Sequence, residues 1–184
     1  PGPGDAIFDA MQDALGHLPI VAEDLGVITP EVEGLRDRHN IPGMRVLQFD
    51  VCDAGFELSD VGENSVCYTG THDNDTTIGW FRGSPDDIRS AEEIESAQQS
   101  ALRITGGKPE TIHIDLIKAA FSTQARIAIA PLQDFLGLGS EARLNTPGVP
   151  GGNWRWRVLE SQLAPEVCDN VADMVRASGR ELIH

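Results

Sequence analysis

The chain has 184 residues, which is long enough for one domain with a hydrophobic core. Its formal net charge of −15 opposes binding to nucleic-acid phosphates, so no nucleic-acid partner is expected. No run approaches the roughly 18 apolar residues of a membrane span, and no basic segment precedes an apolar one at the start. The sequence therefore predicts a soluble, cytoplasmic protein with no membrane partner.

Strand-like and helix-like segments alternate along most of the chain. Short apolar runs predict buried parallel strands at residues 20–22, 44–49, 65–68 and 126–130. Helical spacing and capping residues predict helices over 6–15, from Thr29-Pro30-Glu31 to Asn40, from Ser84-Pro85 to Gly106, from Pro109-Glu110 onward, and over 164–176. This order predicts an α/β fold with a parallel sheet, although four strands do not close a barrel.

The three cysteines give no sign of a disulfide framework. Cys52, Cys67 and Cys168 cannot all pair within one chain, and none lies in a CxxC arrangement, so no zinc site is expected either. We expect all three to be small buried apolar groups.

Two acidic motifs follow predicted strands. Residues 20–22 lead to Glu23, and residues 65–68 lead through Thr-Gly-Thr to Asp73. Because active sites of repeating βα folds form at the C-terminal strand ends, we expect the two carboxylates at the same ends of two strands. Glycoside chemistry needs such a pair, one carboxyl to give a proton and another to stabilise positive charge.

The surroundings of Glu23 allow two interpretations. Glu23 and Asp24 could stabilise the N-terminal end of the following helix through its dipole. Alternatively, with apolar Leu25 and Val27 beside it, Glu23 could keep its proton and act as a general acid.

The run from His72 to Asp75 could be a metal site, a surface turn or a sugar-binding loop. No glutamate follows at the EF-hand spacing and no second histidine lies three or four residues away, so neither a metal nor a cofactor is expected. Asn and Asp are common in turns. A histidine beside the acid favours sugar recognition, because neutral donors next to a carboxylate bind hydroxyls.

Two later segments give weaker signals. Trp154 and Trp156 alternate with Arg155 and Arg157, a pattern more typical of tryptophans that cover the core, although aromatic faces also stack on sugars. The segment that begins at Asn145 is typical of a turn, but its amide could also bind a hydroxyl.

Together these motifs resemble the 4-alpha-glucanotransferase family, glycoside hydrolase family 77, whose members are also called amylomaltases or disproportionating enzymes. The matching segments are residues 2–4, 22–32, 42–44, 46–49, 68–77, 79–80, 132–134, 139–143, 145–148 and 152–154. They occur in the family's order and cover almost the whole chain.

The resemblance implies a (β/α)8 barrel, of which residues 1–184 supply roughly the C-terminal half with no separate second domain. It implies a retaining double displacement that moves α-1,4-glucan segments between maltooligosaccharides or starch-like glucans. Glu23 matches the general acid/base, and Asp73 matches the carboxylate that stabilises the oxocarbenium-like transition state. The resemblance also implies substrate contacts for four further residues: His72, Asn74, Asp53 and Asn145.

The family's nucleophilic aspartate lies in an Arg-Ile-Asp-His-Phe-Arg type of motif, which does not occur in the 184 residues. We therefore expect a C-terminal portion of the enzyme that is inactive alone, because no covalent intermediate can form. The alternatives are an amylase-type hydrolase that passes the glucan to water and a non-catalytic glucan-binding half-barrel.

Lysine occurs only at 108 and 118, so arginine supplies the other twelve of the 14 basic residues. High acid content with little lysine suggests a surface adapted to high salt, where screening weakens self-repulsion. We predict that the melting temperature rises with KCl concentration. A melting temperature independent of KCl would contradict this hypothesis.

Overall fold

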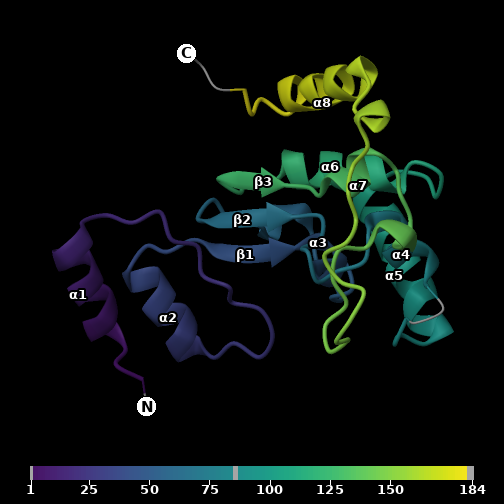
Figure 1. The fold of residues 1–184 in the computed structure, drawn as a ribbon. Coiled ribbons are helices and arrows are strands. Elements are labelled where there is room, and N and C mark those ends of the chain that lie inside the picture. The colour runs from purple at the N-terminus through teal and green to yellow at the C-terminus, as the bar shows by residue number, and fades with distance from the viewer. Residues whose placement is uncertain (1, 85–86, 182–184) are drawn as a thin grey trace.

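A computed structural model describes residues 2–84 and 87–181. Its parallel sheet has the order β1 (Gly43–Val46), β2 (Ser65–Tyr68) and β3 (Ile127–Ile129). Gly43 lies opposite Ser65, and Val66 lies opposite Ile127. All three strands therefore end at the same edge of the sheet (Figure 1).

The helices lie at both ends of this sheet and along its β3 side. They are α1 (Asp5–Leu15), α2 (Pro30–Arg38), α3 (Leu47–Asp50), α4 (Thr77–Arg82), α5 (Ala91–Thr105), α6 (Ile112–Ser122), α7 (Leu132–Phe135) and α8 (Pro165–Ala177), with short 3-10 turns at Leu58–Asp60, Ser140–Ala142 and Glu160–Gln162. In Figure 1, α1 and α2 lie toward the starts of the strands, α4 and α5 lie beyond their ends, and α8 lies on the β3 side.

Three of the four predicted strands are present, and the prediction of a strand at 20–22 is wrong. This segment forms one ladder-like bond, from the Ala22 N–H to the Pro42 carbonyl at 2.8 Å. The next donor on β1, the Met44 N–H, binds the Asp24 carboxylate at 2.7 Å instead of a backbone carbonyl. The predicted strand at 44–49 is also shorter than expected, because α3 begins at Leu47.

The predicted helix starts are accurate for α2 and wrong for α5 and α6. Helix α2 begins at Pro30, although Thr29 makes no side-chain capping bond. The sequence predicts that helix α5 starts at Ser84-Pro85, and residues 85 and 86 lie outside the described residues. Helix α5 begins at Ala91, behind a Ser90–Glu93 capping box, and Ile88 before it is fully exposed.

Helix α6 begins at Ile112, later than the predicted Pro109, because a turn precedes it. The Thr111 N–H donates to the Lys108 carbonyl at 3.1 Å and closes this turn. The C-terminal helix, predicted over 164–176, is confirmed as α8.

The hydrophobic core lies between β2, α3 and helices α4 to α6. Helix α6 contributes Leu116 and Ile117, both completely buried, and β2 contributes Cys67. The prediction of buried cysteines is therefore right for Cys67 and wrong for Cys52 and Cys168, which are exposed.

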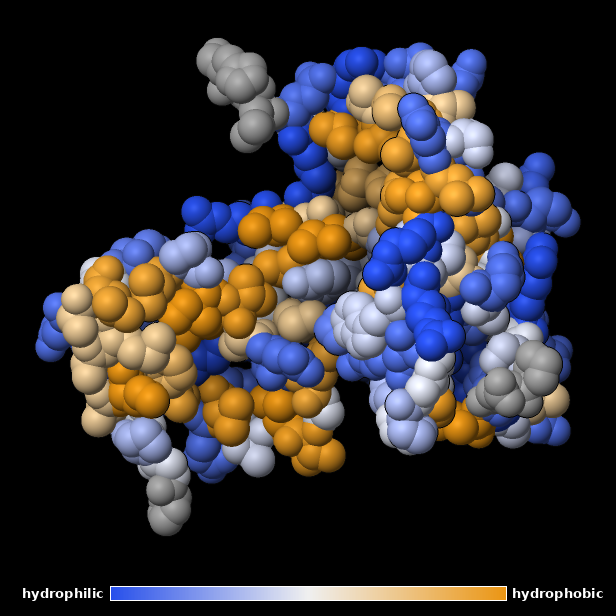
Figure 2. All heavy atoms as spheres, viewed as in Figure 1, coloured by the Kyte–Doolittle hydropathy of each residue, from blue (hydrophilic) through white to orange (hydrophobic). Residues whose placement is uncertain are grey.

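The segments outside this core are less well covered. Helices α1, α2 and α8 have no fully buried residue. Ile127 and Ile129 on β3 are 46% and 42% exposed, and within the described chain β3 pairs only with β2. Figure 2 shows exposed apolar side chains around α1 and beside the sheet. The core thus covers one side of an open sheet.

The environment of Cys67 predicts its reactivity. Burial raises the pKa of the Cys67 thiol to about 11, so only about 0.1% of it is thiolate at pH 8. In iodoacetamide labelling at pH 8, followed by peptide mass spectrometry, we expect native protein to be modified at Cys168 well before Cys67. Denatured protein should label at all three cysteines. Equal rates at Cys67 and Cys168 in the native protein would contradict the burial of this thiol.

Candidate active site

The β2–α4 loop, residues 69–76, carries the polar run that the sequence predicts to bind sugar. The Thr71 backbone N–H and the Thr71 hydroxyl both donate to Asn74 Oδ1, each at 2.9 Å. These bonds close a tight turn from which His72 and Asp73 remain exposed. The Asn74 oxygen therefore shapes the turn, and only its NH2 group is left for a ligand.

The exposed Asp73 carboxylate is the centre of a small cluster. Asn145 Nδ2 donates to Asp73 Oδ1 at 2.5 Å, and His72 Nε2 lies 3.4 Å from the same oxygen. Arg143 Nη2 donates to the Asp73 carbonyl at 2.8 Å, and Arg143 Nε donates to the Asn145 carbonyl at 2.9 Å. The structure thus brings together three of the predicted site residues. Arg143 is an additional residue of this cluster. In the sequence it is indicated only by its place in segment 139–143, one of the segments that carry the family resemblance.

A buried carboxylate holds the two ends of this loop together. Asp134, at the start of α7, is 1% exposed. Its Oδ1 accepts the Thr77 N–H at 2.7 Å, and its Oδ2 accepts the Thr69 and Thr77 hydroxyls, both at 2.8 Å. Burial raises the pKa of Asp134, and the bonds from Thr77 and Thr69 act in the opposite direction. Sequence reasoning did not identify Asp134, because its burial depends on tertiary packing.

The loop is also fixed from the end of β1. Gln48 is buried and donates from Nε2 to the Asp75 carbonyl at 3.0 Å, and Ser140 Oγ donates to Asp75 Oδ2 at 2.6 Å. A Cβ on Gly70 would lie 2.7 Å from Gln48 Nε2, so the Thr-Gly-Thr turn needs glycine there. Segments following all three strands therefore position the loop.

Glu23 is exposed, and among the described residues its side chain makes no hydrogen bond or ion pair. Its neighbour Asp24 instead binds Arg36 and the Met44 N–H. Asp24 therefore joins the C-terminal half of α2 to β1. The interpretation that Asp24 stabilises the N-terminal end of this helix is wrong. One interpretation expected apolar Val27 to cover Glu23. Val27 is 99% exposed and therefore provides no apolar cover.

The hydrogen bonds of the residues on either side of Glu23 show which part of β1 lies next to it. Ala22 binds Pro42 and Asp24 binds Met44, so Glu23 lies beside the first residues of β1. Asp73, by contrast, follows the last residue of β2. The expectation that both carboxylates follow the ends of two strands is therefore correct only for Asp73, and the approach of Glu23 to Asp73 stays a prediction.

The last predicted residue, Asp53, is exposed in the turn after α3. Its N–H donates to the Asp50 carbonyl at 3.0 Å, and in the described structure its side chain makes no hydrogen bond or ion pair with the Asp73 cluster. No group of three or more His, Cys, Asp or Glu residues suited to a metal ion occurs in the described part of the chain.

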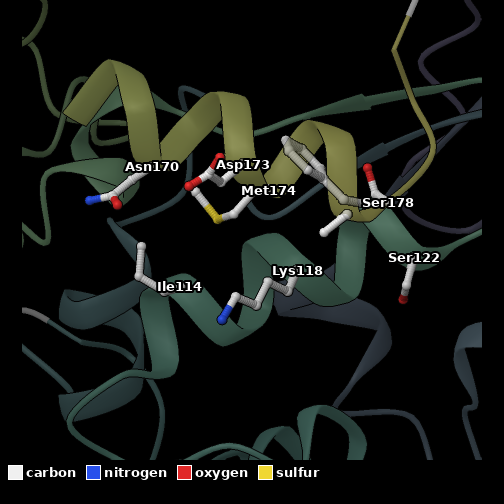
Figure 3. A pocket seen from close by; sticks show the side chains of 9 residues that line it. Ile114, Lys118, Ser122, Asn170, Asp173, Met174 and Ser178 are labelled. Carbon is white, nitrogen blue, oxygen red and sulfur yellow. The ribbon is translucent and has the colours of Figure 1, made fainter. Parts of the chain in front are cut away.

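A groove of about 630 Å³ lies between α6 and α8. Ile114 and Lys118 of α6 face Met174 and Asp173 of α8 across it (Figure 3). None of the predicted site residues lines this groove, so it is separate from the Asp73 cluster.

The parallel sheet, its crossover helices and the polar loop beyond β2 have the architecture of part of a (β/α) barrel, the class of protein in which sites form at the C-terminal strand ends. A family model described as 4-alpha-glucanotransferase matches residues 1–162, and the chain belongs to this family.

Individual relatives agree with this assignment. A 4-alpha-glucanotransferase of Synechocystis sp. is 46% identical over 100% of this chain and 36% of its own length. A chloroplastic/amyloplastic 4-alpha-glucanotransferase of Arabidopsis thaliana is 42% identical over 97% of this chain and 31% of its own. The chain spans about a third of the length of the curated relatives it matches.

The solved structures confirm the fold class. An amylomaltase from Streptococcus agalactiae in complex with acarbose matches with a TM-score of 0.85 and 29% identity, over 97% of this chain and 35% of that chain. The chain is thus α/β and forms part of a (β/α)8 barrel. The described residues supply three parallel strands, one fewer than the sequence predicted.

The loop geometry predicts that Asp134 is essential for stability. Asp134→Ala leaves the Thr77 N–H and two hydroxyls without their buried acceptor, so we expect the free energy of unfolding to fall by about 2–4 kcal/mol. Urea denaturation measures this change. Asp173→Ala is a matched control, because its ion pair with Arg176 is exposed, and it should change stability by less than about 0.5 kcal/mol. Equal effects of the two substitutions would contradict the proposed role of Asp134.

Proposed function

We propose that this chain is the part of a 4-alpha-glucanotransferase that carries its acid/base and its transition-state-stabilising carboxylate. The reaction breaks an α-1,4 bond in a glucan and passes the released segment to the 4-hydroxyl of another sugar. The observation that carries the proposal is the Asp73 cluster with His72 and Asn145. This arrangement offers a carboxylate beside an amide and an imidazole, on a rigidly held loop.

In this proposal Asp73 stabilises the transition state. Asn145 donates to Oδ1, and no group of the described residues donates to Oδ2, which can therefore face a sugar ring that develops positive charge. The Arg143 bond to the Asp73 carbonyl restricts the backbone beneath it. His72, beside the carboxylate, would bind a hydroxyl of the same sugar.

Glu23 is the proposed general acid/base. Its carboxyl is exposed and has no partner among the described residues, so it can exchange a proton with a leaving oxygen and then with an acceptor hydroxyl. The Asp24 bonds to Arg36 and Met44 fix the backbone next to it. We propose Asn74 and Asp53 as further substrate contacts.

The proposed ligand is a maltooligosaccharide or a starch-like α-glucan. Support comes from the family assignment and from the related amylomaltase, which was solved with acarbose. None of the helices within 2–84 and 87–181 combines the length and apolar character needed to cross a lipid bilayer. The cytoplasmic location stays a prediction, since the Arabidopsis relative is named as chloroplastic/amyloplastic.

A retaining double displacement also needs a nucleophilic carboxylate. The motif that the family resemblance associates with it is absent from the 184 residues. This absence favours glucan binding without catalysis as the second candidate function for the chain by itself. Transfer then requires an aspartate supplied by further polypeptide.

We predict that the purified 184-residue chain releases no glucose from maltotriose, because no covalent glucosyl intermediate can form. Chromatography of the products measures this. Glucose release would contradict the inactivity of the chain. Within a longer protein that contains it, oligosaccharides longer than maltotriose indicate transfer, whereas glucose and maltose alone indicate hydrolysis.

In that longer protein, Asp73→Asn should lower kcat about 100-fold or more, since a neutral amide stabilises positive charge poorly. Asp173→Asn, at an exposed position on α8, is the control and should leave kcat unchanged. Equal kcat values for the Asp73→Asn variant and the unaltered enzyme would contradict the role proposed for Asp73.

A further inference from the structure

The segment from Leu144 to Trp154 is a closed loop beyond the C-terminal ends of the strands, seen as the light-green loop in Figure 1. The Trp154 N–H donates to the Leu144 carbonyl at 2.7 Å and joins the two ends. Inside the loop, Asn153 Oδ1 accepts the Thr146 N–H at 3.0 Å, and Asn153 Nδ2 donates to the Val149 carbonyl at 2.8 Å. The position of Trp154 is therefore fixed by the loop's own bonds.

Trp154 combines two features that stability alone does not explain. Its φ is +62°, in the left-handed region that a bulky residue rarely adopts. The residue is nevertheless 52% exposed, so burial does not offset this strain. Strained and exposed residues of this kind occur preferentially at functional sites. Arg157 adds a further restraint, because its Nη1 donates to the Trp154 carbonyl at 2.9 Å.

The indole lies next to the Asp73 cluster. The Trp154 and His72 ring centroids are 5.2 Å apart, with the rings tilted by 37°. His72 Nε2 in turn lies 3.4 Å from Asp73 Oδ1, which also accepts the bond from Asn145. The two ends of the loop thus meet two consecutive residues of the β2–α4 turn.

We propose that Trp154 is an aromatic platform for a glucose ring adjacent to the one that Asp73 binds. A pyranose has an apolar C–H face that stacks on an aromatic ring, while its hydroxyls point outward to polar groups. Trp154 supplies a broad exposed aromatic surface, and His72, Asp73 and Asn145 supply the polar groups beside it. This inference rests on the proposed α-glucan function and adds a second sugar subsite to it.

The test is binding of maltoheptaose to the 184-residue chain, measured by calorimetry. Trp154→Ala should raise Kd about tenfold, the effect of losing one stacked face, and Trp154→Phe should raise it less. Trp156→Ala is the matched control, because Trp156 is a neighbouring, half-buried tryptophan. Its Kd should stay within about twofold of the unaltered chain. Melting temperatures of all variants identify any loss of folding.

Intrinsic tryptophan fluorescence gives a second readout. It reports whether maltoheptaose binds next to Trp154 and does not require a measured loss of affinity. Maltoheptaose should change the emission of the Trp156→Phe variant and leave that of the Trp154→Phe variant unchanged. A Trp154→Ala variant that binds as tightly as the unaltered chain would overturn the platform and leave the glucan function intact. No binding by the unaltered chain at about 10 mM maltoheptaose would overturn the glucan site and the platform together.

Discussion

The carboxylate of Asp134 is the constraint on which the arrangement of the site depends. It lies inside the protein and accepts three bonds, from Thr69 at the end of β2 and from Thr77 at the start of α4. A buried carboxylate is costly unless its oxygens are well bonded, so this geometry tolerates little displacement of either threonine. The loop between them is therefore clamped at both ends, and Asp73 projects from a backbone with fixed start and end points.

Three successive βα units contribute residues to the site. The segment after β1 contributes Gln48, the segment after β2 contributes the loop itself, and the segment after β3 contributes Asp134. The later polypeptide adds Asn145 and Arg143 around Asp73. Parallel strands end at one edge of the sheet, so residues distant in sequence meet there without long connections. This explains how the exposed side chains of His72 and Asp73 can stand on a well-packed base.

Local sequence patterns predicted the parts of this structure that local physics controls. The apolar runs of β1 to β3 were recognisable because burial acts over a few residues, and a turn was one of the three interpretations that the residues from His72 to Asp75 allowed. The run at 20–22 has the same composition but pairs at one point, since the Asp24 side chain binds the Met44 N–H that a strand would use. Asp134 was missed because nothing in its neighbours shows that two threonines approach it from another βα unit. The place of Glu23 beside the first residues of β1 likewise depends on pairing between distant segments.

The closed loop between Leu144 and Trp154 couples the position of the Asn145 amide on Asp73 to the position of the Trp154 indole beside His72. Asn145 and Trp154 stand at its opposite ends, joined through the bond between the Leu144 carbonyl and the Trp154 N–H. A rigid-body shift of this loop therefore moves the amide on Asp73 and the indole beside His72 as a unit. Substitution of residues at its tip, around Gly148, can consequently change the positions of the Asn145 amide and of the indole at the same time. Evolutionary variation of this tip would be a route to moving both groups together while every contacting side chain stays unchanged.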